Sequence, residues 1–267
     1  QYTENKTIAW ATQSFTFPPS AQSNLSNVKI IDIDQDGGID LTLIDDTTTG
    51  VIITNIFGNV VDIDKYTEWA KQTDKFLVFD NAATAYTFYK GKNCLNYGNG
   101  CIISFHHTKP FGFGEGGAII VDKKYEHAIR CLNNFGIGLT TNNYWVKEGN
   151  NNKMSDISAV YILQFLMNNF DKIINHHNDL YKHVKDKIEK CDNPITTWKL
   201  FPSFHYNDII VPSCLCLLFD SYDDNIRLKL LENNIYCRKY YYPLKNTKVA
   251  CEIFDSILCI SFTTETT

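Results

Sequence analysis

Residues 101–117 read CIISFHHTKPFGFGEGG, an apolar segment that runs into two histidines, a lysine and a glycine-rich loop. A second segment, residues 76–83, reads FLVFDNAA, and its apolar run ends on the carboxylate of Asp80. Both segments have the composition of short buried strands. Because open α/β sheets bind ligands at the carboxyl ends of their strands, the polar side chains that follow these segments are candidate site residues.

Lys109 and Asp80 together indicate more than either residue does alone. An isolated aspartate at the end of a strand commonly caps a turn or helix, and an isolated lysine is usually solvated. A lysine at the mouth of a strand, beside a hydroxyl and glycines and facing an acid on a neighbouring strand, suits pyridoxal phosphate. The glycine-rich loop lacks the lysine order of a P-loop and the glycine spacing of a dinucleotide site, so nucleotide-phosphate sites of those kinds are excluded.

The first half of the chain repeats a short apolar run, a turn rich in Gly, Asn or Asp, and an amphipathic stretch. The predicted strands are Val28–Ile33, Val51–Ile56, Phe76–Asp80, Cys101–Phe105 and Ala118–Val121, and the predicted helices are Ile63–Gln72 and Lys123–Asn133. The strands show little alternation, which is typical of parallel strands covered on both faces. The predicted fold class is therefore α/β, with a mostly parallel, doubly wound sheet.

The second half has a different pattern. No proline or glycine interrupts Ser155–Cys191, and its apolar spacing predicts one long helix, or two joined near Asn168. Strand-like segments at 209–211, 214–219 and 257–262 and a helical stretch at 223–233 then indicate a smaller α+β unit. We predict a large cofactor-binding domain over residues 1–170 and a small C-terminal domain over residues 171–267.

Composition narrows the classes of partner. The 267 residues are 44% apolar, which is enough for a buried core, and the net charge of -5 argues against a nucleic-acid or anionic-membrane binder. No apolar run approaches the ~18 residues of a membrane span. The nine cysteines are odd in number and lack CxxC spacing, so we interpret them as reduced thiols of a cytosolic-type protein. The expected partner is a small molecule or another protein.

The lysine segment resembles a known family. Ser104-Phe-His-His-Thr-Lys109, followed by Gly114-Glu-Gly-Gly117, is similar to the Ser-Phe-His-x-x-Lys and Gly-Glu-Gly-Gly motifs of the DegT/DnrJ sugar aminotransferases, at the same spacing. Further counterparts are Ser14–Phe17, Ile53–Gly58, Tyr89–Gly91 and Gly149–Asp156, so the resemblance covers nearly the whole chain. It implies a fold type I enzyme that uses pyridoxal phosphate to aminate keto sugars carried on nucleotides.

The resemblance implies roles for the residues of the cofactor site. Lys109 would form the Schiff base with the cofactor and move the proton between cofactor and substrate, and Ser104 would bind the phosphate. Matching the small residues places Asn81 at the ring-nitrogen position, whereas anchoring on residues 89–91 places Asp80 there. Only a carboxylate holds that nitrogen protonated near neutral pH, so we assign Asp80.

Three further positions follow from the same resemblance. Phe17 would stack on the ring, and Ala83 occupies the position where the family has Gln or His. Asn151 would reach across a dimer interface to the cofactor phosphate of the partner, so the active site of a homodimer would be shared. Asparagines replace the tyrosines that usually flank this residue in the family.

Other residues are candidates for the substrate. His107, Arg238 and Tyr241 are predicted to bind it, since a guanidinium suits a diphosphate and related enzymes often carry an aromatic segment with arginine there. The segment around Arg238 could equally be an edge strand with no such role. His106 and His107 have no Asp, Glu or Cys at metal spacing in the sequence, so we predict no metal site.

The sequence thus predicts a cytoplasmic transaminase that moves an amino group from glutamate to a nucleotide-linked keto-deoxy sugar. Lys109 argues against the dehydratases of the family, in which histidine replaces it. The alternative is a non-catalytic α/β binding protein or an inactive fragment, because the family's N-terminal Gly-Thr turn, which cradles the phosphate, has no counterpart before Ser14. The sugar, its ring carbon and the nucleotide stay open.

Overall fold

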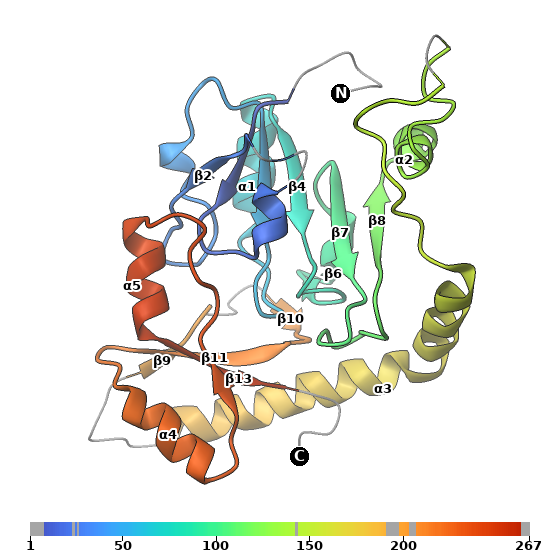
Figure 1. The fold of residues 1–267 in the computed structure, drawn as a ribbon. Coiled ribbons are helices and arrows are strands. Elements are labelled where there is room, and N and C mark those ends of the chain that lie inside the picture. Colours follow the sequence, from blue (N-terminus) through green and yellow to red (C-terminus); the bar gives the residue numbers. More distant parts are fainter. Residues whose placement is uncertain are drawn as a thin grey trace.

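The computed structural model describes residues 8–22, 25, 27–141, 144–190, 198–202 and 207–262, around a six-stranded sheet (Figure 1). The strands follow the order β2 (Lys29–Ile31), β1 (Trp10–Gln13), β3 (Gly50–Thr54), β4 (Phe76–Asp80), β7 (Gly100–Ser104) and β8 (Gly117–Val121). Neighbouring strands run parallel except for β7 and β8. The predicted α/β class and its mostly parallel sheet are confirmed.

Strand β1 lies inside the sheet although its sequence does not predict a strand. It reads WATQ, and both Thr12 and Gln13 are fully buried. The Gln13 carboxamide bonds to the backbone of Thr54: Oε1 accepts from the N–H at 3.0 Å and Nε2 donates to the carbonyl at 3.2 Å. Because these bonds satisfy the buried amide, a polar residue is tolerated in the sheet core.

Strand β8 runs antiparallel to β7, whereas its composition predicts a member of the parallel set. The connecting residues 105–116 form a ladder in which Phe105 N–H donates to the Gly116 carbonyl and His107 N–H donates to the Gly114 carbonyl, both at 2.9 Å. A parallel return needs a crossover, usually a helix, and these residues, all of them described, contain none.

Helix α1 (Ile63–Gln72) has the predicted bounds and packs Ile63, Tyr66 and Ala70 against the sheet core. The second predicted helix is a 3-10 turn, η5 (Lys123–Tyr125), that leads into α2 (Glu126–Leu132). Further 3-10 turns in the described part of the chain include η1 (Pro18–Ala21), η3 (Leu41–Leu43) and η4 (Cys94–Asn96). Helix α1 and the turns η1, η3 and η4 lie between strands of the large sheet or the short strands beside it, whereas η5 and α2 lead from β8 to the next helix.

Helix α3 (Asp156–Glu189) is continuous, so the segment predicted as one helix or two is a single helix. Its first part packs Ile162 on Ile103 and Phe105, and its last part packs Tyr181 in a cluster with the small sheet. The helix therefore crosses the domain boundary predicted at residue 170, and that boundary stays a prediction.

The C-terminal part forms a second sheet, called the small sheet below. Its strands follow the order β12 (Cys237–Arg238), β13 (Ile257–Ser261), β11 (Cys214–Phe219) and β9 (Trp198–Leu200), and all neighbours are antiparallel. Two helices accompany it, α4 (Asp224–Glu232) and α5 (Lys248–Ser256). A third sheet, made of short strands, joins β10 (Asn207–Ile209) to β5 (Phe88–Tyr89) and β6 (Lys92–Asn93). The second sheet lies below the lower ends of β4 and β7, where these parallel strands terminate (Figure 1).

The contact between the two main sheets is apolar. Phe15, which follows β1, and Phe57, which follows β3, lie in one cluster with Cys214, Cys216 and Cys259 of the small sheet. This cluster fixes the small sheet against the strand ends where a ligand site is expected. Among the helices of the described residues, none combines the length and apolarity that a membrane crossing requires.

Candidate active site

Asp80 ends β4 and is buried, with 7% of its surface exposed. Its Oδ1 accepts the Ala82 N–H at 3.0 Å, and its Oδ2 accepts the Ser20 hydroxyl at 3.4 Å. The next residue points elsewhere, because Asn81 Oδ1 accepts from Asn55 Nδ2 at 2.6 Å. The carboxylate of Asp80, rather than the amide of Asn81, therefore faces the lysine loop.

Lys109 lies in the tight loop that follows β7. Its N–H donates to the His106 carbonyl at 2.9 Å, and its carbonyl accepts the Gly112 N–H at 2.8 Å. A Cβ on Gly112 would lie 2.0 Å from the His106 carbonyl oxygen, so only glycine fits this return of the chain. The loop thereby holds Lys109 at the mouth of the sheet, one strand away from Asp80.

The two charges influence each other. Burial raises the pKa of the Asp80 carboxyl, while the Ala82 N–H, the Lys109 ammonium and the Ser20 hydroxyl favour its charged form. Burial also lowers the pKa of Lys109, against the attraction of Asp80 and Cys214. A lysine with a lowered pKa is neutral, and so nucleophilic, at a lower pH than a free lysine.

Ser104 is the last residue of β7, five positions before Lys109. Its Oγ accepts the His106 N–H at 3.1 Å. Because the oxygen is the acceptor in that bond, the hydroxyl proton can be donated in another direction. A hydroxyl and a loop of backbone amides at a strand end suit the oxygens of a phosphate.

Aromatic rings line the side of the small sheet. Tyr241 stacks on Phe57 with ring centroids 5.0 Å apart and packs edge-on against Phe15 at 5.8 Å. Burial raises the pKa of Tyr241, and the electrostatic influence of Cys214 and Asp80 adds to this effect. Phe17 packs beside Tyr241 at 6.4 Å but is 60% exposed, which leaves ring surface available to a ligand.

Ser20 belongs to this site although no motif identifies it. Pro18 and Pro19 begin the turn η1, and this turn buries Ser20 against Asp80. The prolines are the one local signal, because proline favours the first positions of a helical turn. Ala83 is buried three residues beyond the end of β4.

Three predicted site residues do not contact this group in the structure. His107 is exposed and its ring packs on His106 at 4.1 Å. Arg238 is exposed on β12 and donates to the Tyr240 hydroxyl at 3.1 Å. Asn151 is also exposed and pairs with Asn134 in an isolated bridge next to α2.

The hydrogen-bonded loop between β7 and β8 also brings together three polar side chains whose spacing in the sequence does not predict their contact. Glu115 folds back so that its carboxylate lies 3.4 Å from His106 Nε2. Ligand atoms of His106, His107 and Glu115 all lie within 4.8 Å of one another, although the sequence offers no acid at metal spacing. His107 and Glu115 are exposed and His106 is half-buried, and exposed acidic groups are common without a metal.

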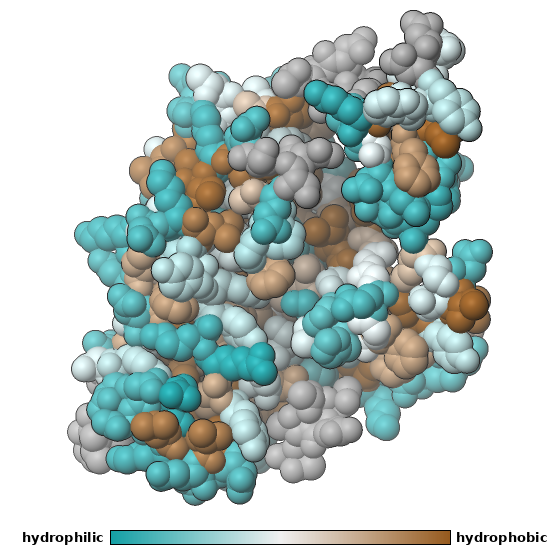
Figure 2. Space-filling view, in the orientation of Figure 1, coloured by the Kyte–Doolittle hydropathy of each residue, from teal (hydrophilic) through white to brown (hydrophobic). Residues whose placement is uncertain are grey.

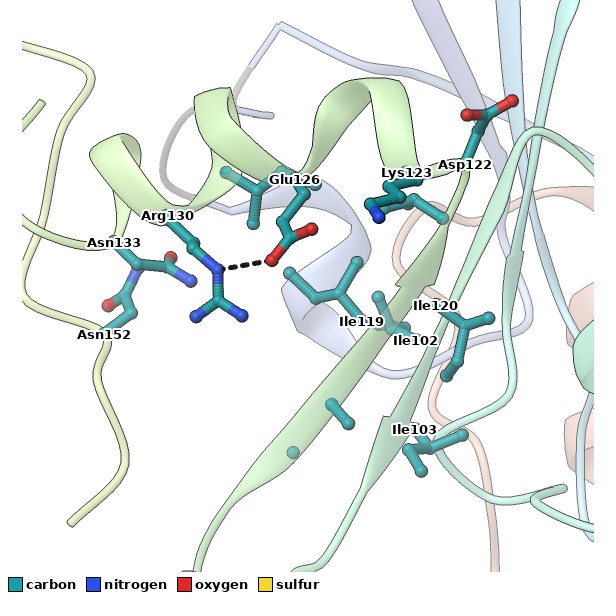
Figure 3. Close-up of a pocket in the computed structure, with 14 residues that line it drawn as sticks. Ile102, Ile103, Ile119, Ile120, Asp122, Lys123, Glu126, Arg130, Asn133 and Asn152 are labelled. Carbon is teal, nitrogen blue, oxygen red and sulfur yellow. Dashed lines mark hydrogen bonds and ion pairs between the residues drawn. The ribbon is translucent and has the colours of Figure 1, made fainter. Parts of the chain in front are cut away.

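A groove of about 750 Å³ lies apart from this chemistry, over one face of β7 and β8 below α2 (Figure 3). Ile102 and Ile119 project into it from the strands, and Arg130 and Glu126 form an ion pair at 2.8 Å above them. None of the predicted site residues lines this groove. The candidate active site is therefore the cluster of Asp80, Lys109, Ser104, Ser20 and Tyr241.

Solved structures share this fold. A DegT DnrJ EryC1 StrS aminotransferase from Brucella abortus matches with a TM-score of 0.83 at 18% identity, over 97% of this chain and 75% of that one. Helicobacter pylori PseC, an aminotransferase, matches with a TM-score of 0.80 at 18% identity, over 97% and 77%. These likenesses define the fold as that of the fold type I aminotransferases.

The model of the DegT/DnrJ/EryC1/StrS aminotransferase family matches residues 11–256, and the chain belongs to this family. It is 26% identical to the dTDP-4-amino-4,6-dideoxy-D-glucose transaminase of Shigella dysenteriae over 80% of this chain and 61% of that protein. It is 27% identical to a UDP-4-amino-4,6-dideoxy-N-acetyl-beta-L-altrosamine transaminase of Campylobacter jejuni over 73% and 58%. The chain spans about three fifths of the length of these curated relatives.

Proposed function

We propose that this protein is a pyridoxal-phosphate-dependent aminotransferase that transfers an amino group from glutamate to a nucleotide-linked keto-deoxy sugar. The observation that carries the proposal is the pairing of the half-buried Lys109 with the buried Asp80 at the ends of neighbouring strands. Membership of the family supports the reaction class. The names of the Shigella and Campylobacter relatives, both transaminases of nucleotide-linked amino sugars, support the substrate class.

The side chains present fit the cofactor by their chemistry. Asp80 is a buried carboxylate whose burial disfavours its charge, so a protonated ring nitrogen beside it would be a compensating cation. Lys109 is an amine with a lowered pKa, as condensation with an aldehyde requires. Ser104 retains a proton to donate to a phosphate oxygen. A fold neighbour, a GDP-4-keto-6-deoxy-D-mannose-3-dehydratase from E. coli, holds this cofactor.

When bound, pyridoxal phosphate supplies a ring that withdraws electrons from the carbon that carries the amine. Asp80 would hold the proton on the ring nitrogen, and Ser104 would orient the phosphate. Lys109 Nζ would carry the proton between the two carbons that exchange the amine, as a general acid and base. Phe17 would cover one face of the ring and Ala83 would lie beneath it, and both would exclude water.

We assign the sugar nucleotide to the open side of this cluster, where Tyr241 meets Phe17. Arg238 would contact the diphosphate from the exposed edge strand β12, since a guanidinium fork matches phosphate oxygens. His107, exposed on the lysine loop, would contact the sugar. The lysine at position 109 favours a transaminase over a dehydratase of the same fold.

We also propose a homodimer with a shared active site. The first half of α3 exposes apolar side chains, and Figure 2 shows apolar atoms over that part of the molecule, at its right edge. The exposed residues are Ile157, Val160, Tyr161, Leu163 and Met167. An exposed apolar patch of this kind is typical of a protein interface. Asn151 lies just before this helix, and we infer that it would enter the partner's site from there.

The proposal is tested by incubating the purified protein with pyridoxal phosphate, glutamate and a panel of dTDP-, UDP- and GDP-linked keto-deoxy sugars. We expect one aminated sugar nucleotide by mass spectrometry, formed in equal amount to 2-oxoglutarate. Lys109→Ala should abolish both products, and Lys123→Ala, an exposed lysine of η5, should not. A protein that binds the cofactor yet aminates none of the sugars would contradict the proposed substrate class. A protein that does not bind it would be a non-catalytic binding protein.

A further inference from the structure

Three cysteines gather on one face of the small sheet, between it and the large sheet. The Cys216 and Cys259 sulfurs are 3.2 Å apart, and the Cys214 sulfur is 3.5 Å from that of Cys216. Cys214 and Cys216 are two residues apart on β11 and so share a face. All three are buried, with at most 5% of their surface exposed. The proposed reaction uses none of these thiols.

The backbone brings Cys216 and Cys259 directly opposite each other. They are register partners on the antiparallel strands β11 and β13. In such a ladder, hydrogen-bonded pairs alternate with non-hydrogen-bonded pairs. Phe262 N–H donates to the Ser213 carbonyl at 3.2 Å, so that pair is hydrogen-bonded, and the alternation makes the pair three steps further along, Cys216 and Cys259, non-hydrogen-bonded.

A second bond confirms this assignment. The Cys216 carbonyl accepts the N–H of Phe201 at 3.0 Å, so its polar backbone groups face β9 rather than β13. Non-hydrogen-bonded partners have Cα atoms about 4.5 Å apart, and disulfides bridge Cα separations of roughly 4.4 to 6.8 Å. The two sulfurs can therefore close to bonding distance by side-chain rotation, without moving either strand.

We propose that Cys216 and Cys259 form a site of reversible disulfide formation between the two main sheets. The oxidant is a soluble low-molecular-weight disulfide such as glutathione disulfide. Both sulfurs are buried, and burial raises the pKa of both thiols, so the exchange takes place when the small sheet opens transiently. A Cys216 or Cys259 thiolate then attacks one glutathione sulfur and displaces one glutathione thiolate, and the second cysteine displaces the other. One S–S bond breaks and one forms, the two cysteines lose two electrons and two protons, and two reduced glutathiones are released.

Cys214 is the competing partner, and the geometry ranks it second. It lies along the same strand as Cys216, and its sulfur is farther from Cys216 than that of Cys259. Residues two apart on an extended strand are separated by about 6.6 Å, near the upper limit for a disulfide. Cys214→Ser is therefore the matched control variant, because it removes a neighbouring thiol of the same face and leaves the proposed pair intact.

The test equilibrates the full chain in glutathione buffers of graded potential. Free thiols are then blocked under denaturing conditions, and disulfides are reduced and labelled with a second reagent. We expect two labelled cysteines in oxidising buffer, mapped to Cys216 and Cys259, and full reversal in reducing buffer. Cys214→Ser and Cys251→Ser, a half-exposed cysteine of α5, should keep both labels, whereas Cys216→Ser should lose them.

Three outcomes would overturn the proposal: no labelled pair at any potential, a pair that includes Cys214, or a thiol-bound metal in the purified protein with no disulfide. Peptide mapping of the unmodified chain alone decides among these outcomes, so the test does not depend on the folding of Cys216→Ser. The readout is also independent of transaminase activity.

Discussion

Asp80 and Asn81 are consecutive residues whose side chains leave the end of β4 in opposite directions. The Asp80 carboxylate accepts bonds from Ser20 and Ala82 on the side of Lys109, whereas the Asn81 amide bonds to Asn55. Successive side chains of a strand point to opposite faces, so only one of the two can meet a ligand at the lysine. This geometry favours the register that uses Asp80, and the role of Asp80 at the ring nitrogen stays a proposal.

This relationship predicts different outcomes for two substitutions. Asp80→Asn should fold normally but lower turnover about 100-fold or more, because an amide cannot hold a proton on the ring nitrogen. Asn81→Ala should keep the cofactor but lose about 1–3 kcal/mol of stability, because it leaves the buried Asn55 amide without its partner. Steady-state kinetics and urea unfolding separate the two effects. If Asn81→Ala lost the cofactor and Asp80→Asn did not, the assignment would be wrong.

Ser20 should tune the carboxylate of Asp80. Its hydroxyl helps to lower the pKa of Asp80 against the effect of burial, so Ser20→Ala should raise that pKa further. Since the ionised form is then lost at a higher pH as the solution is acidified, the acid limb of the pH–rate profile should move to higher pH. The bond is long, so we expect a weakening of cofactor binding of about 2- to 5-fold. Ser155→Ala, an exposed serine that makes no capping bond, is the control and should leave the profile unchanged.

The exposed apolar side chains in the first half of α3 predict a dimer interface, and one charged substitution there should weaken the association. Val160→Glu would place an unpaired charge in the apolar patch, and we expect the dissociation constant to rise at least about 10-fold. Lys187→Glu, on the solvated last turn of the same helix, should leave association unchanged. Sedimentation at several concentrations measures both variants. Equal association of Val160→Glu and the unmodified chain would place the interface elsewhere.

His177 predicts how stability depends on pH. It is fully buried on α3, its Nδ1 donates to the Pro212 carbonyl at 2.9 Å, and burial lowers its pKa. The folded state therefore holds the neutral imidazole, while the unfolded chain takes up a proton as the pH falls below about 6.5. Stability should decline from that pH downward, with a slope of at most about 1.4 kcal/mol per pH unit from this group.

Variants isolate this contribution. His177→Asn keeps a donor for the Pro212 carbonyl but cannot titrate, so its unfolding free energy should depend less on pH than that of the unmodified chain. His183→Asn, an exposed position on the same helix, should retain the full dependence. Urea unfolding from pH 5 to 8 gives the comparison, and parallel curves for all three proteins would refute a role for His177.

The strands that the sequence predicts are those with dense apolar runs, such as β3 and β4. Helix α5 was not predicted, because its N-terminus is capped from a distant part of the chain. Asp32 accepts the N–H groups of Val249 and Ala250 at 2.9 and 3.1 Å, whereas the adjacent Thr247 makes no cap of its own. A carboxylate at a helix N-terminus stabilises the helix wherever it lies in the sequence, and no local pattern records it.

The residues of the candidate site also fall into those that the sequence predicts and those that only the fold reveals. Lys109 and Asp80 could be chosen from sequence, because each follows an apolar strand and strand ends converge. Ser20 could not, because only the folding of η1 brings it to that edge. The grouping of Glu115 with His106 depends on the antiparallel turn into β8, which the composition of that strand does not reveal.

The most direct test of the account is the site of covalent cofactor attachment. The protein is incubated with pyridoxal phosphate, reduced with borohydride, digested and mapped by mass spectrometry. We predict visible absorbance before reduction and the reduced adduct on Lys109 alone, with none in Lys109→Ala and a weaker adduct in Asp80→Asn. An adduct on another lysine, or none at saturating cofactor, would contradict the central claim that Lys109 and Asp80 form the cofactor site.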